Sequence, residues 1–355
     1  MHADYLIVGQ GISGSLLSRE LMQHNCSVCV IDDNAPVAAS RVAGGIINPV
    51  TGKRLVRSWM TEQLMPFALA AYTKMEEEWG VKIVRPCGIV DFFYSAELRN
   101  HFEEKLESEQ EYLSPLTLGE EWSGYFRFNY GTGTIAPCLL VDMAAMLHKC
   151  HESLRSHGAL REEDFNPHDL VVHEDHIIYR DITAGKVLFC DGALGAANPY
   201  FSMLPWSADK GEALILSIPG LPATHIYKQG HISIAPWKDG LFWAGASHDW
   251  KYTDPGITAA FRKNMEEQLS YWLKIPYEVV GHVAGLRPAN MERKPFVGLH
   301  PRYKAVGILN GMGGKGCSMA PYFAHELAAH LTNGSPLTPA VDIKRFERIL
   351  MKRFG

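Results

Sequence analysis

The chain has 355 residues, of which 46% are hydrophobic and 21% are charged, and its formal net charge at pH 7 is −5. This composition supports a large hydrophobic core and about two domains. No long basic run is present, so a broad nucleic-acid footprint is not evident, although a local basic patch stays open. No apolar stretch reaches about 18 residues, so we expect no membrane-spanning helix and no membrane partner.

The cysteines and the start of the chain indicate a reducing compartment. The 7 cysteines are scattered and odd in number, which suits the cytoplasm. A strand is expected from Asp4 onwards, which leaves no room for a signal or transit peptide. His148, Cys150 and His151 share an expected helix but have no partner motif, so we predict no metal site.

The first part of the chain predicts a strand, a glycine-rich turn, a helix and a second strand. Residues 4–8 are apolar, residues 12–25 have leucines at helical spacing, and residues 27–31 form a second apolar run before Asp32. Three glycines occupy the turn in the pattern G-x-G-x-x-G: Gly9, Gly11 and Gly14. This arrangement is typical of a dinucleotide-binding fold, in which a helix N-terminus faces the pyrophosphate.

Asp32 stands where such folds place the acid that binds a ribose 2′-hydroxyl, about 20 residues after the last glycine. A carboxylate there disfavours a 2′-phosphate, so NADP is not expected. The predicted cofactor contacts of this part are Gly9, Gly11, Ile12, Ser13, Gly14, Asp32 and Asp33.

Residues 34–50 form a small, glycine-rich and mostly uncharged segment. Backbone without large side chains can lie close against a flat ligand, and loops of this length are often functional. An ordinary surface loop is the alternative. The candidate cofactor contacts of this segment are Ser40, Arg41, Ala43, Gly44 and Gly45.

The next part of the chain mixes helices and strands. Apolar periodicity predicts helices at residues 58–79, 96–107 and 141–157, and β-like runs at residues 83–94 and 124–135.

Further strands are expected between residues 170 and 190, and the last of them ends at Asp191 and Gly192. That strand end is similar to one that touches the cofactor in flavoproteins with two dinucleotide domains. A core strand followed by a plain turn is an equally good interpretation.

Residues 211–246 alternate as antiparallel strands and are rich in aromatic side chains, and residues 258–273 predict a helix. An aromatic sheet face suits the wall of an apolar pocket, although such residues are more often plain core.

The last third contains a second strand, glycine turn and helix: a strand at residues 305–309, a turn at 310–316 and a helix at 318–331, followed by a basic terminal helix at 342–354. The N-terminus of the helix after the turn could face a flavin ring and stabilise its reduced, negatively charged form. A nicotinamide dehydrogenase has no need of this feature, so the two glycine turns together favour FAD over NAD.

These residues resemble the D-amino-acid oxidase superfamily, within the branch of glycine oxidase and sarcosine oxidase. The resemblance covers nearly the whole chain and rests on these motifs: Gly9, Gly11 and Gly14 with Asp32, residues 39–46, Lys210-Gly211-Glu212, residues 284–288 and residues 313–316. The last motif, followed by Ala320-Pro321, is also similar to the oxidase domain of the bifunctional tRNA wobble-uridine enzyme, although this chain shows no methyltransferase half.

The resemblance implies an α/β fold, α+β overall, with a Rossmann-like FAD-binding domain interleaved with an antiparallel-sheet substrate domain. We assign residues 1–80, 141–205 and 283–355 to the first domain, and residues 81–140 and 206–282 to the second.

The implied activity is oxidation of a C–N bond in an amino acid or N-substituted amino acid, by hydride transfer to flavin N5 with O2 as the usual acceptor. Three alternatives stay open: a dehydrogenase with a non-oxygen acceptor, modification of the tRNA wobble uridine, and an FAD-binding module without turnover.

Two residues are candidates for direct roles in that reaction. In the family an arginine in a matching G-L-R-P stretch pairs with the substrate carboxylate, and this resemblance assigns that role to Arg287, whose planar fork suits a bidentate pair. Lys315 would place a cation near the flavin and help electron transfer to O2, or it points to solvent. The glycines around it, Gly313, Gly314 and Gly316, are predicted cofactor contacts. No cysteine stands at the flavin-linking position of the sarcosine oxidases, so we predict non-covalent FAD.

Overall fold

The computed structural model describes residues 1–52 and 54–352, and the chain divides into two compact units. Unit 1 consists of Met1–Arg41, Ala144–Asp209 and Leu286–Gly355, and unit 2 of Val42–Met143 and Lys210–Gly285. Each unit is therefore assembled from stretches that are distant in the sequence. Residues 42–80, which the sequence analysis places with the FAD-binding segments, belong to unit 2.

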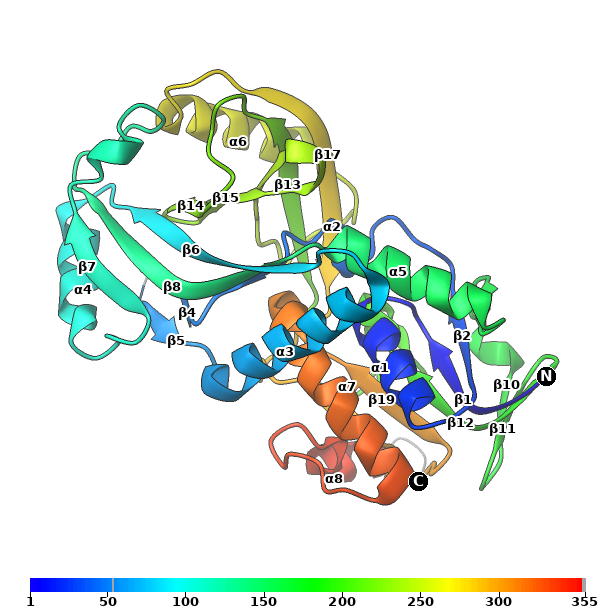
Figure 1. The fold of residues 1–355 in the computed structure, drawn as a ribbon. Coiled ribbons are helices and arrows are strands. Elements are labelled where there is room, and N and C mark those ends of the chain that lie inside the picture. Colours follow the sequence, from blue (N-terminus) through cyan, green and yellow to red (C-terminus); the bar gives the residue numbers. More distant parts are fainter. Residues whose placement is uncertain (53, 353–355) are drawn as a thin grey trace. The chain divides into compact units, whose positions relative to one another are not determined.

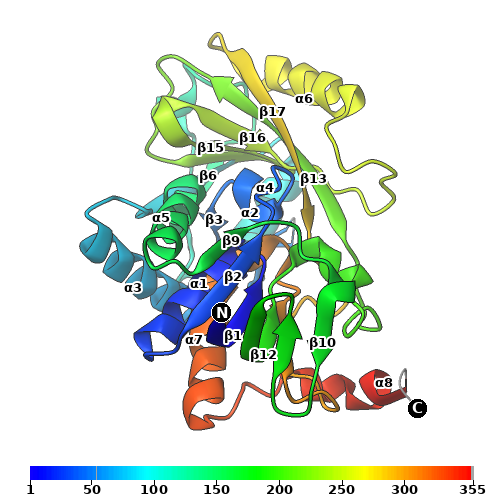
Figure 2. The same ribbon diagram turned by 90° about the vertical axis from the view of Figure 1, so that its right-hand side faces the viewer.

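Unit 1 is built on a sheet whose five central strands run parallel in the order β9, β2, β1, β12 and β19 (Figure 1; β9 is labelled in Figure 2). Three more strands join it in antiparallel fashion, β18 on β19 and the β10–β11 hairpin on β12. The bounds are β1 His2–Val8, β2 Val28–Asp32, β9 Leu160–Glu162, β10 Leu170–Val172, β11 Ile177–Tyr179, β12 Ile182–Phe189, β18 Phe296–Leu299 and β19 Val306–Asn310.

Helices α1 (Ile12–Gln23) and α7 (Gly316–Asn333) pack against each other and both contact β19 (Figure 1, Figure 2). Helix α5 (Met143–Ser156) also belongs to unit 1 except for its first residue, and α8 (Glu347–Lys352) ends the described chain. Residues 5–8 of β1 and 28–31 of β2 are buried, nearly continuous apolar runs, as expected of parallel strands that are covered on both faces. As a result the carboxyl ends of β1, β2, β12 and β19 meet at one edge, where the helices begin.

Unit 2 is built on a largely antiparallel sheet in the order β17, β13, β16, β15, β14, β6, β8 and β3, with β7 paired to β8 and with β14 parallel to β6. The strand bounds are β3 Ile46–Ile47, β6 Val84–Phe92, β7 Leu113–Thr117, β8 Thr132–Val141, β13 Asp209–Ser217, β14 Ile226–Gln229, β15 Ile232–Pro236, β16 Phe242–Gly245 and β17 Glu278–Arg287. Its helices are α3 (Thr61–Trp79), α4 (Ala96–Leu106) and α6 (Ala259–Trp272).

Short elements complete the chain. They are α2 Ala39–Val42, β4 Val50–Thr51, β5 Val56–Arg57, and the 3₁₀ turns Glu120–Trp122, Pro167–Asp169, Gly192–Ala197, Lys238–Gly240, Gly313–Lys315 and Ile343–Phe346. None of the described helices combines the length and hydrophobicity that crossing a bilayer requires.

Two sequence predictions of elements are wrong in part. The β-like run at residues 124–135 becomes a strand only from Thr132, because the chain turns up to residue 125 and Phe126 makes only an isolated bridge with Leu273. The Phe126 ring is still buried in the core and packs on Trp272, so its burial does not require a strand. The basic terminal helix is a 3₁₀ turn followed by the short α8, and residues 353–354 of the prediction lie outside the described residues.

The aromatic strands of unit 2 are mostly core. Phe242 and Trp243 are buried, while Trp250, on the loop that follows β16, is 62% exposed. Phe242 packs in a cluster with residues of β13, β14 and α6.

A buried histidine in unit 1 gives a prediction about acid stability. His300 is 1% exposed, its Nδ1 accepts from the N–H groups of Arg302 and Tyr303 at 3.1 and 3.2 Å, and burial together with the Arg302 charge lowers its pKa to about 4. The neutral ring therefore stabilises the fold above pH ~6.5, the value of an unfolded histidine, and this stabilisation is lost as the pH falls towards 4.

Between pH 7 and pH 4 we expect the wild type to lose at most about 3 kcal/mol of its free energy of unfolding through this histidine. The variant His300→Asn, which lacks the titrating ring, should lose less over the same pH range. Urea denaturation between pH 7 and pH 4 measures it, with His24→Asn at the exposed end of α1 as the control. Equal pH slopes for wild type and His300→Asn would contradict the assignment.

Candidate functional site

The first glycine turn of unit 1 leaves no room for side chains at two of its positions. Gly9 has a φ of +98°, and a Cβ there would lie 2.6 Å from the carbonyl oxygen of Cys190. A Cβ on Gly14 would lie 1.8 Å from the carbonyl oxygen of Gly9. The turn thus packs closely against the strand ends and α1. Because these positions carry no side chains, the backbone N–H groups at the start of the helix are left accessible to a ligand. This cradle fits the pyrophosphate of a dinucleotide.

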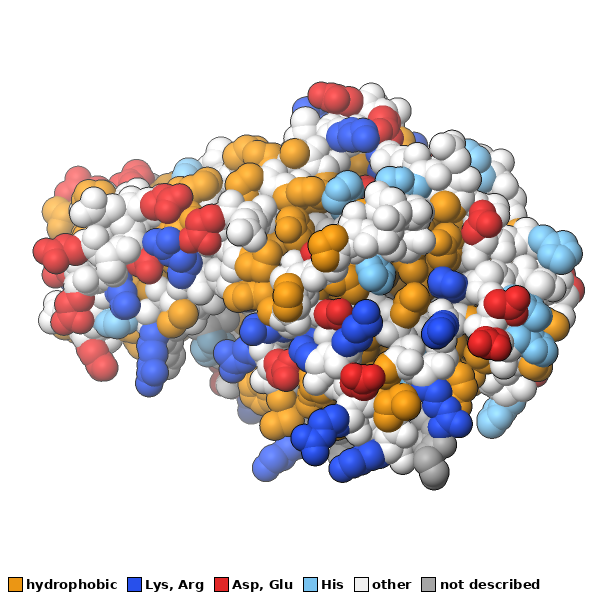
Figure 3. Space-filling model, turned by 90° about the horizontal axis from the view of Figure 1, so that it is seen from below, with side chains coloured by type: hydrophobic (Ala, Val, Ile, Leu, Met, Phe, Trp, Pro, Cys, Tyr) orange, Lys and Arg blue, Asp and Glu red, His pale blue; other side chains and the backbone are white. Residues whose placement is uncertain are grey.

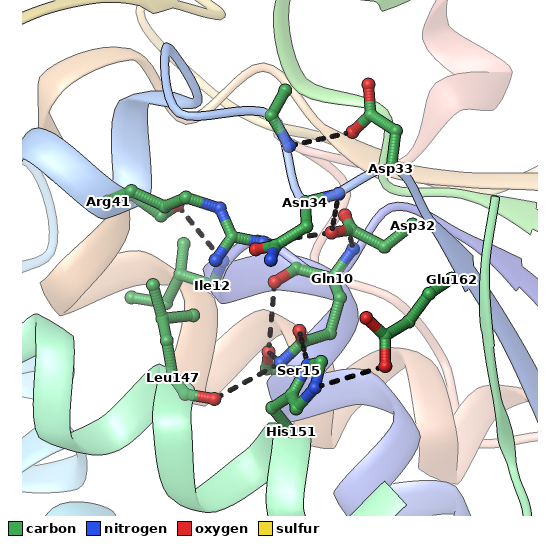
Figure 4. A network of polar contacts seen from close by, with 12 residues as sticks. Gln10, Ile12, Ser15, Asp32, Asp33, Asn34, Arg41, Leu147, His151 and Glu162 are labelled. Atoms are coloured by element: carbon green, nitrogen blue, oxygen red, sulfur yellow. Dashed lines mark hydrogen bonds and ion pairs between the residues drawn. The ribbon is translucent and has the colours of Figure 1, made fainter. Parts of the chain in front are cut away.

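Asp32 is held at the end of β2 by three donors (Figure 4). Its Oδ2 accepts from the N–H of Gln10 at 2.6 Å, and its Oδ1 accepts from the N–H of Asn34 at 2.9 Å and from Nη2 of Arg41 at 2.9 Å. The carboxylate is therefore fixed next to the turn, where an adenosine ribose is bound in dinucleotide folds. Asp33 is exposed and accepts from the N–H of Ala35 at 3.0 Å, which shapes the chain after β2.

Ser40 joins the loop to the same turn. Its Oγ accepts from the N–H of Ile12 at 3.0 Å and lies 3.3 Å from the position of a Cβ on Gly11. Because Arg41 follows it in α2 and reaches Asp32, the predicted residues Ile12, Ser40, Arg41 and Asp32 come together in unit 1.

The second glycine turn lies beside the first. A Cβ on Gly316 would be 3.2 Å from Cγ2 of Ile12, and Oγ of Ser13 lies 3.7 Å from Sδ of Met312. The N-termini of α1 and α7 therefore converge, and each contributes a partial positive charge. Lys315 is partly buried at this turn, and its burial and the charge of Arg293 lower its pKa.

Asp191 links the ends of β12 and β19. Its carboxylate accepts from the side-chain amides of Asn198 at 2.9 Å and Asn310 at 2.7 Å, and burial raises its pKa to about 6. The same Asn310 amide donates to the carbonyl of Gly192 at 2.9 Å. A Cβ on Gly9 would lie 3.3 Å from the Cα of Asp191, so this pair adjoins the first turn.

Arg287 forms an ion pair with a buried acid of the same unit. Its Nη1 lies 2.6 Å from Oδ2 of Asp209, and the side chains are 17% and 5% exposed. Ser207 donates its N–H to the carbonyl of Ala289 at 2.8 Å, and the same antiparallel register places Asp209 opposite Arg287. A Cβ on Gly314 would lie 3.7 Å from Cδ of Arg287, so this arginine stands beside the second glycine turn.

Three predicted contacts belong to unit 2, where the packing explains their small size. A Cβ on Gly44 would lie 2.9 Å from the indole of Trp243, whose Nε1 donates to the carbonyl of Val42 at 3.0 Å. Gly45 has a φ of +71°, and a Cβ there would lie 1.9 Å from the carbonyl oxygen of Val141. Ala43 lies between Val42 and Gly44 on this loop.

Sequence analysis missed Asp209 and Asn310. Asp209 directly precedes the Lys210-Gly211-Glu212 motif, and Asn310 ends β19 directly before a glycine. Asn310 ends β19, as Asp32 ends β2, and Asp191 comes shortly after the end of β12. This position at a strand end is the sequence feature that could have identified Asn310. Within residues 1–52 and 54–352, no group of three or more His, Cys, Asp or Glu side chains could hold a metal ion.

The arrangement of two glycine turns and an acid on a parallel sheet defines a dinucleotide-dependent enzyme, and the comparison with protein families names the class. Residues 4–330 match DAO, the family described as FAD dependent oxidoreductase. The chain belongs to this family, and FAD is its cofactor.

Similar proteins share this fold over nearly the whole chain. Glycine oxidase from Geobacillus kaustophilus superposes with a TM-score of 0.78 at 19% identity, covering 95% of this chain and 96% of the other. L-proline dehydrogenase from P. horikoshii gives a TM-score of 0.78 at 17% identity and covers 98% of both chains. These likenesses confirm the predicted fold class.

A curated relative is the tRNA 5-methylaminomethyl-2-thiouridine biosynthesis bifunctional protein MnmC of Caulobacter vibrioides, which is 25% identical over 93% of this chain and 55% of its own length. The chain spans about half the length of the curated relatives it matches.

Proposed function

We propose that this protein oxidises a C–N bond of an amino acid or N-substituted amino acid, with unit 1 binding FAD non-covalently and unit 2 serving as the substrate domain. The observation that supports this proposal most is the position of Arg287 beside the second glycine turn. A guanidinium there can pair with a substrate carboxylate while the turn and α7 border the flavin. Amino-acid substrates are also named for glycine oxidase and L-proline dehydrogenase, which share the fold.

When bound, FAD supplies the two-electron oxidation, and the residues of the chain supply binding and orientation. The first turn would hold the pyrophosphate, Asp32 would hold the ribose, and the N-terminus of α7 would favour negative charge on the ring. Arg287 would bind the substrate carboxylate and so orient the substrate in the site. Lys315 adds a positive charge at the same turn, where it would favour reaction with O2.

Two other functions have some support. L-proline dehydrogenase has the same fold, which supports transfer of the electrons to an acceptor other than O2. The likeness to MnmC supports a role in tRNA modification. Against this second function, the net charge is −5, and on the face shown in Figure 3 basic and acidic side chains are intermixed.

The test is a visible spectrum of the purified protein, followed without oxygen through a panel of amino acids and N-substituted amino acids. We expect flavin absorption that bleaches with one substrate class, because reduction removes the oxidised flavin band. Oxygen uptake with and without an artificial acceptor then separates an oxidase from a dehydrogenase. Flavin bands that no amino acid bleaches, together with tight tRNA binding, would favour the tRNA function instead.

A further inference from the structure

Gln10 is the residue between Gly9 and Gly11 in the first glycine turn, and its polar side chain is 1% exposed. Its Nε2 donates to Oγ of Ser15 at 3.1 Å and to the carbonyl of Leu147 at 3.3 Å, and its Oε1 lies 3.2 Å from Nδ1 of His151 (Figure 4). One buried amide thus ties the turn to both α1 and α5.

These partners determine the proton on the histidine. The Leu147 carbonyl accepts only, so the NH2 of Gln10 faces it and the amide oxygen faces His151. A carbonyl oxygen also accepts only, and Nδ1 of His151 must therefore carry the hydrogen. His151 and Leu147 are one helical turn apart on α5, so this helix presents one donor and one acceptor to the same amide.

The other ring nitrogen of His151 lies near the carboxylate of Glu162. Nε2 of His151 lies 3.6 Å from Oε1 of Glu162, which Arg155 also approaches at 3.8 Å. Glu162 is the register partner of Asp32 across β9 and β2. His151 therefore stands between the amide that supports the turn and the acid beside Asp32.

We propose that His151 is a positioning residue of the FAD site and acts on Asp32 through Gln10. The N–H of Gln10 donates to Oδ2 of Asp32 at 2.6 Å, so the orientation of that residue fixes the carboxylate that binds the ribose. Without the Nδ1 donor, the buried Oε1 of Gln10 loses a hydrogen bond, which a buried acceptor regains only by turning. Because Nε2 is also held by Ser15 and Leu147, the amide can turn only if the backbone of Gln10 shifts with it. That shift displaces the backbone N–H that holds Asp32, and the affinity for FAD falls.

The experiment measures the dissociation constant of FAD from the apoprotein by quenching of flavin fluorescence. We expect His151→Leu to weaken binding by about tenfold or more, corresponding to one lost buried hydrogen bond. His151→Asn should restore most of the affinity, because its Nδ2 can donate from the place of Nδ1. The matched control is His148→Leu on the same helix, whose side chain is 65% exposed and contacts Glu152.

A double variant separates positioning from general packing. If His151 acts through Gln10, then Gln10→Met with His151→Leu binds FAD no more weakly than Gln10→Met alone. Three results would each overturn the proposal. They are full additivity of the two changes, an affinity of His151→Leu equal to that of the wild type, and an affinity of His151→Asn no better than that of His151→Leu. The wild type binding no FAD would instead contradict the cofactor assignment itself.

Discussion

Gly14→Ala is expected to abolish stable FAD binding. The new Cβ would lie 1.8 Å from the carbonyl oxygen of Gly9, so either α1 or the end of β1 must move by more than an ångström. Such a shift separates the helix N-terminus from the pyrophosphate, and we expect the affinity for FAD to fall at least about 100-fold. The flavin-to-protein absorbance ratio after purification and a titration of apoprotein with FAD measure the effect.

Gly124→Ala is the matched control for this substitution. A Cβ there meets nothing within 4 Å, and its φ is not in the left-handed region. It should retain FAD at the level of the wild type. If Gly14→Ala also retains it, the turn is not the pyrophosphate site.

Arg287→Ala should affect both stability and catalysis, because this side chain has a buried partner. Removing it takes the guanidinium away from Asp209, whose side chain is 5% exposed, and breaking a buried ion pair by deleting one member costs about 3–5 kcal/mol. It also removes the proposed carboxylate contact, so we expect kcat/KM for amino acids to fall at least about 100-fold. Urea denaturation and steady-state kinetics measure the two effects separately.

The double substitution of Arg287→Leu and Asp209→Leu distinguishes the two roles. Replacing both members of the ion pair removes the buried carboxylate together with the guanidinium and should recover most of the free energy of unfolding. If Arg287 binds substrate, the double variant stays inactive while it binds FAD. Recovery of activity along with stability would show that the ion pair is structural and that another residue binds the carboxylate.

The first glycine turn is predictable from sequence because part of its constraint is local. A Cβ on Gly14 would meet the carbonyl oxygen of Gly9, five residues earlier in the same turn, whereas the conflict at Gly9 is with the distant Cys190. The end of β2 likewise places Asp32 without any information from the rest of the chain.

The ion pair of Arg287 with Asp209 is not predictable in this way. Its partners are 78 positions apart and meet only because β13 and β17 are neighbours in a sheet whose order the sequence does not display. Gly44 illustrates the same limit. A glycine is needed there because the indole of Trp243 lies against it, and the sequence alone cannot distinguish a flat side chain from a flat ligand at that place.

The link between Asp191 and Asn310 has a consequence for how the protein is made. The strands that these residues follow or end are separated by the whole of β13 to β18, and α1, the first helix of the chain, packs on α7, the last long one. During synthesis the first turn leaves the ribosome long before the segment that completes its surroundings. We therefore expect tight FAD binding to come late, after the final third of the chain has packed, and bound FAD to stabilise the fully assembled molecule.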